Sequence, residues 1–179
     1  ALGELCEGQA VEMRDLFDPG RTVDAHLSSI RSKTAALFGC ACRLGAMGGA
    51  LSATNREALA RFGVAFGMAF QVLDDVLDVI GDAGRMGKPT GNDIVAGVYT
   101  LPVIRALAGP DGDELRALLA GGAPADLRAA LDVVRRSGTM ADALALADRY
   151  GDEARRAVRH LDQTTVGVDP VIMLTGPIP

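Results

Sequence analysis

The chain contains few of the residues on which several protein classes depend. It has no tryptophan, and only 4% of its 179 residues are aromatic. It therefore lacks the aromatic platforms on which single-stranded nucleic acid stacks. The net charge is −5, and no lysine- or arginine-rich run is present. Composition and charge together argue against a nucleic-acid partner.

Long apolar runs are also missing from the chain. No stretch reaches the roughly 18 uncharged apolar residues that a membrane-spanning helix needs. Residues 1–20 lack the basic start and the apolar middle of a signal peptide. The sequence therefore predicts a cytoplasmic protein without a membrane span.

Cysteine and histidine are scarce. The three cysteines, Cys6, Cys40 and Cys42, are an odd number that frames no disulfide network, so we expect them to be reduced. They also make a poor zinc set, because no histidine stands at a matching interval. The two histidines, His26 and His160, are expected to be helix caps or surface residues.

Aliphatic side chains are what the sequence does contain. Hydrophobic residues make up 49% of it, and with so few aromatics the core must be built from Ala, Leu and Val, a composition that favours helices. We expect residues 1–161 to form a single helical domain and residues 162–179 an irregular tail. Expected helices cover residues 3–17, 23–49, 54–81, 93–108, 111–120, 124–137 and 139–160. The second of these is expected to break, kink or end early at its glycines.

The most informative segment is residues 70–82, which read FQVLDDVLDVIGD. On a helix, its polar side chains share one face: Gln71, Asp74, Asp75, Asp78 and Asp82. The opposite face is predicted to meet the core and consists of Val72, Leu73, Val76, Leu77, Val79 and Ile80. Neighbouring carboxylates repel one another, and their oxygens suit Mg²⁺, an ion that also binds substrate phosphates. The alternative is a solvated acidic face.

Glycines surround this acidic stripe. Gly63 and Gly67 precede it at one-turn intervals, and their bare backbone is expected to leave room for a ligand. After the stripe, residues 84–102 form a loop broken by glycine and proline that carries Lys88, and Asp93 stands at the expected start of the next helix. A lysine on a flexible loop can clamp a diphosphate.

These residues resemble the trans-isoprenyl diphosphate synthase, or polyprenyl synthetase, family. Four motifs stand in the family's order: Gln9 and Glu12; Lys33 and Thr34; Gln71, Asp74, Asp75 and Asp78 of the second aspartate-rich motif; and Gly87, Lys88, Gly91 and Asp93, followed by Thr100, Leu101 and Pro102. The family's first aspartate-rich motif is absent from this chain. The resemblance therefore implies the C-terminal half of an all-α, isoprenoid-synthase-type helical bundle around a central cavity, with the N-terminal helices missing.

The resemblance also implies an activity, which is condensation of an allylic diphosphate with isopentenyl diphosphate by a dimethylallyl/geranyl-type trans-prenyltransferase that uses Mg²⁺. By analogy, Asp74 would ligate one Mg²⁺ and Asp75 and Asp78 would hold its waters. Lys33 and Lys88 would grip the diphosphate. Thr34 and Gln71 would steady the carbocation.

Two function classes stay open at this point. One is a prenyltransferase to which this chain supplies one wall of the metal site, with the isolated chain inactive. The alternative is a catalytically silent partner or regulatory subunit of an active synthase. Either would form a homodimer or a hetero-oligomer with the missing half or another synthase chain. Terpene cyclisation ranks last, because its Asn/Ser/Glu metal motif is absent.

Two other acidic clusters could in principle replace the missing motif. They are Asp111, Asp113 and Glu114, and Asp148, Asp152 and Glu153. Both are expected to be helix-start or surface charge. Product chain length stays open, because the residues that set it in this family lie near the first motif.

Overall fold

The fold is described by a computed structural model that covers residues 1–81 and 90–161. Its helices are α1 (Leu2–Arg14), α2 (Val23–Ile30), the π-helical turn η1 (Arg31–Ala35), α3 (Ala36–Gly48), α4 (Ala53–Ile80), α6 (Asn92–Ala96), α7 (Leu101–Leu107), α8 (Gly112–Leu119), α9 (Leu127–Arg136) and α10 (Thr139–Val158). Within these two ranges no residue lies in a strand. The predicted all-α class is confirmed.

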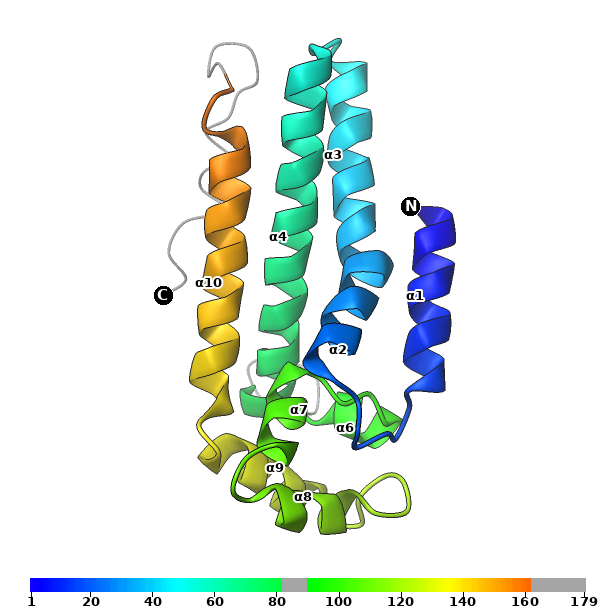
Figure 1. Ribbon diagram of the computed structural model, residues 1–179, viewed down its shortest axis with the longest axis vertical. Helices are drawn as coiled ribbons and strands as arrows, with labels where there is room; N and C mark the ends of the chain where they lie inside the picture. The colour runs from blue at the N-terminus through cyan, green and yellow to red at the C-terminus, as the bar shows by residue number, and fades with distance from the viewer. Residues whose placement is uncertain (82–89, 162–179) are drawn as a thin grey trace.

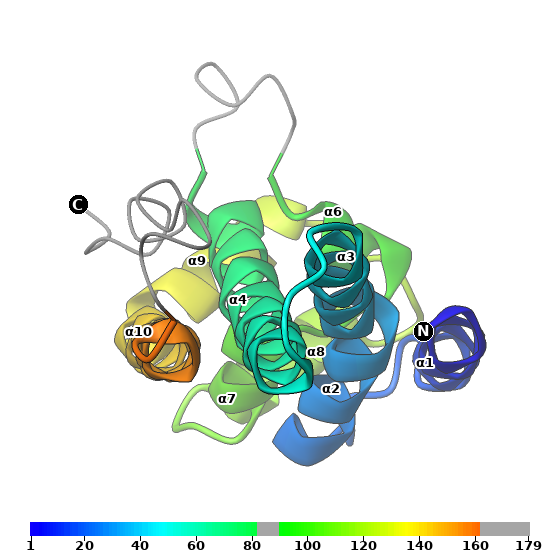
Figure 2. The same ribbon diagram turned by 90° about the horizontal axis from the view of Figure 1, so that it is seen from above.

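The long helices stand side by side. They follow one another across the molecule in the order α10, α4, α3 and α1, while the short helices α6, α7, α8 and α9 gather at one end (Figure 1). The view from above shows the same order, with α4 in the middle of the row (Figure 2). Helix α4 packs most extensively on α10 and α3. It is therefore the element against which the others are positioned.

Helix α4 begins and ends close to the predicted residues, 54 and 81. The hydroxyl of Ser52 caps its start by accepting the backbone N–H of Asn55 at 3.2 Å. On its core face Val72, Val76 and Val79 are at most 1% exposed. Leu77 and Ile80 are 42% and 48% exposed, so their predicted burial is wrong. The helices packed on α4 cover only part of the apolar face that the sequence pattern predicts.

The predicted helix over residues 23–49 is interrupted, but not at its glycines. The interruption is the turn η1, and α3 then runs on through Gly39 and Gly45. Gly39 faces α4 so closely that a Cβ there would lie 2.6 Å from a methyl group of Val64. This glycine serves helix packing, which explains why the chain does not bend there.

The predicted helix over residues 93–108 is two helices. Gly97 ends α6 in the left-handed conformation, with φ +79°, which glycine adopts at no steric cost. The ring of Phe17 occupies the place that a side chain would need. The chain then enters α7 after Thr100.

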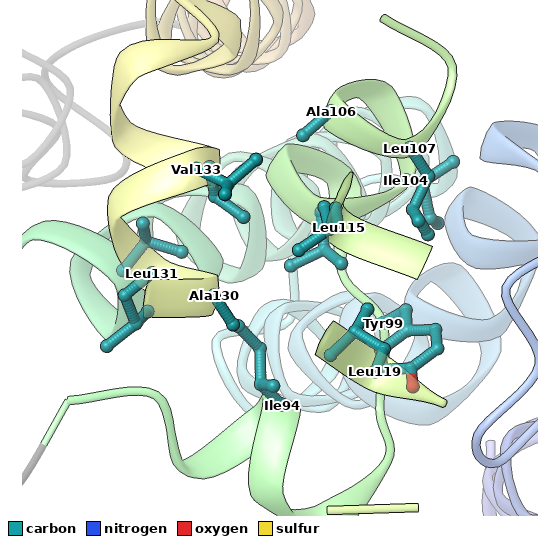
Figure 3. Packing of buried hydrophobic residues seen from close by; sticks show 13 residues of the cluster. Ile94, Tyr99, Ile104, Ala106, Leu107, Leu115, Leu119, Ala130, Leu131 and Val133 are labelled. Atoms are coloured by element: carbon teal, nitrogen blue, oxygen red, sulfur yellow. The ribbon is translucent and has the colours of Figure 1, made fainter. Parts of the chain in front are cut away.

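Three apolar clusters form the core. One lies at the end of the bundle where α7, α8 and α9 pack, and includes Tyr99, Leu115 and Val133 (Figure 3). The second lies beneath the acidic part of α4 and includes Ile30, Val72 and Val76. The third joins α4 to the far end of α10. None of the described helices has the length and apolarity required to traverse a membrane.

The two outer acidic clusters and the cysteines behave as predicted. Exposed ion pairs join Arg116 to Asp113, Arg136 to Asp111 and Glu114, and Arg155 to Asp152. Cys6, Cys40 and Cys42 are free thiols. The carboxylates of both outer clusters are therefore surface charge.

Candidate functional site

Polar side chains from several helices meet around one small cavity. It has a volume of about 110 Å³ and lies where α1, the α2–η1 segment, α4 and the residues around α6 come together. Its lining residues are Glu12, His26, Ile30, Lys33, Thr34, Gln71, Asp75, Asp93, Val98 and Thr100. The cavity thus brings together all three predicted catalytic residues and the predicted metal residue Asp75.

The turn η1 carries the Lys-Thr motif. A π-helical turn inside an α-helix often marks a functional site, and this one directs Lys33 and Thr34 to the cavity. Helix α1 lies against it because Gly8 lacks a side chain, since a Cβ there would be 2.9 Å from the backbone nitrogen of Lys33. This close approach lets Lys33 Nζ donate to Glu12 Oε1 at 2.6 Å.

A chain of hydrogen bonds joins η1 to α4 and α2. Thr34 Oγ1 donates to Gln71 Oε1 at 2.9 Å, and Gln71 Nε2 donates to Asp75 Oδ1 at 3.2 Å. The other carboxylate oxygen of Asp75 lies 2.8 Å from His26 Nε2. Asp75 and His26 are each 1% exposed. Thr34 and Gln71, two of the predicted catalytic residues, therefore belong to a polar network that is partly buried.

Asp78 fastens α6 to α4. Its two carboxylate oxygens each accept a backbone N–H at 3.1 Å, one from Asn92 and one from Asp93. Its own carbonyl accepts the N–H of Gly91 at 2.8 Å. Gly91 has φ +79° and precedes the first turn of α6. These bonds bring Asp93 to the cavity.

Negative charge is crowded at this corner of the molecule. The pKa of Asp93 is raised from its ordinary value to about 7, first by burial and then by the nearby carboxylates of Asp78, Asp75, Asp74 and Glu12. A cation placed among these groups would relieve their mutual repulsion.

The three predicted metal residues differ in environment. Asp74 is exposed on α4, Asp75 is buried and Asp78 is half-buried. Over residues 1–81 and 90–161, no three histidine, cysteine, aspartate or glutamate side chains gather closely enough to hold a metal ion by themselves. Lys88, the second predicted diphosphate ligand, lies outside the described residues.

Two expectations about the surroundings of the stripe are wrong. The backbone of Gly63 and Gly67 faces neighbouring chain instead of a ligand, because a Cβ at these positions would lie 2.5 Å from Phe38 O and 2.7 Å from Ala35 Cα. His26 is neither a cap nor a surface residue. It stands four positions before the buried Ile30, on the inner face of α2, and that spacing was the signal for its burial.

The profile of one protein family, polyprenyl synthetase, matches residues 1–134. The chain belongs to the polyprenyl synthetase family. One relative, component 2 of the heptaprenyl diphosphate synthase of Geobacillus stearothermophilus, is 34% identical over 155 residues, which are 84% of this chain and 48% of the relative. The nonaprenyl diphosphate synthase of Mycobacterium tuberculosis is 37% identical over 158 residues, which are 86% of this chain and 47% of the relative.

Solved structures of the family share the fold. The geranylgeranyl pyrophosphate synthase of Corynebacterium glutamicum, in complex with calcium and isoprenyl diphosphate, has a TM-score of 0.82 and 33% identity, over 97% of this chain and 56% of that one. The decaprenyl diphosphate synthase of Rhodobacter capsulatus has a TM-score of 0.80 and 29% identity, over 97% and 56% of the two chains. This polyprenyl synthetase chain thus spans about half the length of its relatives, which agrees with the C-terminal half that its motifs predict.

Proposed function

We propose that this chain supplies one wall of a cytoplasmic prenyltransferase site that joins an allylic diphosphate to isopentenyl diphosphate. The observation that carries the proposal is the convergence of Lys33, Thr34, Gln71 and Asp75 on one cavity. Family membership supports the same chemistry. A diphosphate leaves only when its developing negative charge is matched by positive charge in a preorganised site.

Mg²⁺ fits the donor chemistry of this corner. The side chains that would hold it are Asp74 directly and Asp75 and Asp78 through water. Hard carboxylate oxygens suit the ion, and Mg²⁺ commonly uses only one or two protein carboxylates together with water and substrate phosphate. A self-sufficient protein cage is therefore not required. When bound, the ion would stabilise the charge of the departing diphosphate.

Side chains of this chain would bind the diphosphate and stabilise the carbocation. Lys33 would donate charge-assisted hydrogen bonds to the diphosphate, in place of its present bond to Glu12. The hydroxyl of Thr34 donates a hydrogen bond to Gln71, which leaves the lone pairs of the hydroxyl oxygen available to a carbocation. Lys88 stays a predicted second ligand of the diphosphate. No acid needs to protonate the leaving group.

A chimaera tests this proposal. The N-terminal half of the Mycobacterium tuberculosis relative would be joined to this chain, and incorporation of labelled isopentenyl diphosphate into prenyl product would be measured with and without Mg²⁺. We expect Mg²⁺-dependent product from the chimaera and none from the isolated chain. A folded chimaera without product, or turnover by the pure isolated chain, would contradict the proposal.

The second candidate function is a silent partner subunit of an active synthase. Two relatives carry the name "component 2" of a heptaprenyl diphosphate synthase, which favours a role in a two-component assembly. Exposed large apolar side chains also favour coverage by a second polypeptide, as a homodimer or hetero-oligomer. They include Leu37, Leu44, Met47, Phe70, Leu77 and Ile80. A silent subunit would alter the rate or product length of an added active synthase without binding Mg²⁺ and pyrophosphate itself.

A further inference from the structure

Among the described residues, the side chain of His26 makes one hydrogen bond, and its partner belongs to the candidate site. The residue is 1% exposed, and its Nε2 lies 2.8 Å from Asp75 Oδ2. Its other ring nitrogen, Nδ1, is buried and has no hydrogen-bond partner among the described residues. Burial of an unpaired polar atom costs free energy that an apolar side chain of similar size would avoid. Packing alone therefore does not account for a histidine at this position.

The contact determines which ring nitrogen of His26 carries a proton. An aspartate carboxylate offers only acceptors, so the hydrogen bond requires the proton on Nε2 of His26.

The second oxygen of the Asp75 carboxylate determines how the Gln71 amide is turned. With Oδ2 of Asp75 held by His26, Oδ1 accepts from Gln71 Nε2 at 3.2 Å. Gln71 must then present its carbonyl oxygen to Thr34. If the Gln71 amide were turned by 180°, its NH2 group would face the Thr34 hydroxyl and its carbonyl oxygen would face the Asp75 carboxylate.

We propose that His26 is a positioning residue, which holds the Asp75 carboxylate and through it orients Gln71 and Thr34 at the cavity. The chemical role of this arrangement rests on the proposed function. Oxygen atoms that face the cavity favour a developing carbocation, whereas an N–H in the same place would repel it. Without His26, a buried carboxylate oxygen loses its donor, so Asp75 is no longer held in one orientation.

NMR of the parent chain gives the first test. The sequence has only two histidines, so the His160→Gln variant assigns both imidazole rings. We expect Nε2 of His26 to carry a proton. A bare Nε2 would overturn the proposal. This measurement needs no ligand and is independent of the proposed function.

Two substitutions then separate positioning from packing. His26→Gln keeps a donor close to the place of Nε2, whereas His26→Met keeps only the bulk. We expect slowly exchanging side-chain amide protons of Gln71 in the parent and in His26→Gln, and at least fivefold faster exchange in His26→Met. The matched control is His160→Met, because His160 is exposed. Parent-like Gln71 exchange in folded His26→Met would refute the positioning role.

Binding of Mg²⁺ and inorganic pyrophosphate connects the network to function. Calorimetry should show affinity within about twofold of the parent for His26→Gln and His160→Met, and at least fivefold weaker for His26→Met. Equal affinities in all four proteins would contradict the inference. If the parent chain itself binds no pyrophosphate, the proposed function of this wall fails, while the proton on Nε2 and the Gln71 exchange still decide the role of His26.

Discussion

Two acidic regions of this molecule have similar compositions and opposite surroundings. Near α8 and α9, Asp111, Asp113 and Glu114 are exposed and paired with arginines. Around α4 and α6, Asp75 and Asp93 lie at a cavity. Among the described residues that line it, Lys33 is the only lysine or arginine, and its ammonium group already bonds to Glu12. The arginines balance the first cluster, which stays on the surface as solvated charge, whereas an added cation would relieve the repulsion among the carboxylates of the second.

The pKa values express the same contrast. The hydrogen bond from Arg155 lowers the pKa of the exposed Asp152. Burial and neighbouring carboxylates raise the pKa of Asp93 to about 7. Burial among carboxylates thus raises the pKa of an aspartate, whereas an arginine partner on the surface lowers it.

The largest expected effect concerns Asp74. In the chimaera, Asp74→Ala should lower prenyl-product formation by at least about a hundredfold, the scale of losing one preorganised electrostatic contact. The same substitution at Asp148, an exposed aspartate of α10, should leave turnover unchanged. Steady-state turnover equal to that of the parent in Asp74→Ala would remove this residue from the metal site.

Asp75 should matter for stability as well. Asp75→Ala leaves the buried His26 Nε2 and the part-buried Gln71 Nε2 without their acceptor, so urea unfolding should show a loss of about 1–3 kcal/mol. The outer cluster provides the comparison. Asp113→Ala breaks only an exposed ion pair and should leave the urea midpoint unchanged. Equal losses in both variants would contradict the distinction between the two regions.

Lys33 and Lys88 should be energetically coupled if both contact one diphosphate. Each substitution to alanine should weaken binding of an unreactive allylic diphosphate analogue in the presence of Mg²⁺. The double variant should depart from additivity by about 0.5 kcal/mol or more, because the two lysines would share a partner. Calorimetry at moderate salt, which screens long-range attraction, is the measurement. Parent-like affinity in Lys88→Ala would exclude that lysine from the site.

The smallest effect is expected at the surface ion pairs. Arg116→Ala removes the exposed contact with Asp113, although it also removes a hydrogen bond to Leu107 O. A cleaner variant is Asp132→Ala, which breaks only the exposed bond to Arg135. Analogue affinity and unfolding midpoint should both match the parent. A measurable loss of affinity would show that charge outside the cavity also contributes to the site.

Sequence periodicity predicted the helices well where one apolar face decides the structure. The predicted bounds of helix α4, residues 54 and 81, lie within one residue of the observed ones, because its apolar pattern repeats over many turns. The predicted break at the glycines of residues 23–49 was wrong. In a sequence, a glycine that bends a helix cannot be told from a glycine that lets a neighbouring helix pack closely. The close packing of Gly39 on α4 shows that it has the second role.

By itself, the sequence determined the helical class and the family, and it predicted which face of α4 would carry the chemistry. These depend on the spacing of residues along one chain, which a repeating pattern records directly. Tertiary structure alone decided which carboxylates are buried, that Asp78 holds α6, and that His26 meets Asp75 across 49 positions of sequence. Such contacts depend on how closely helices approach one another, and no local pattern encodes that distance.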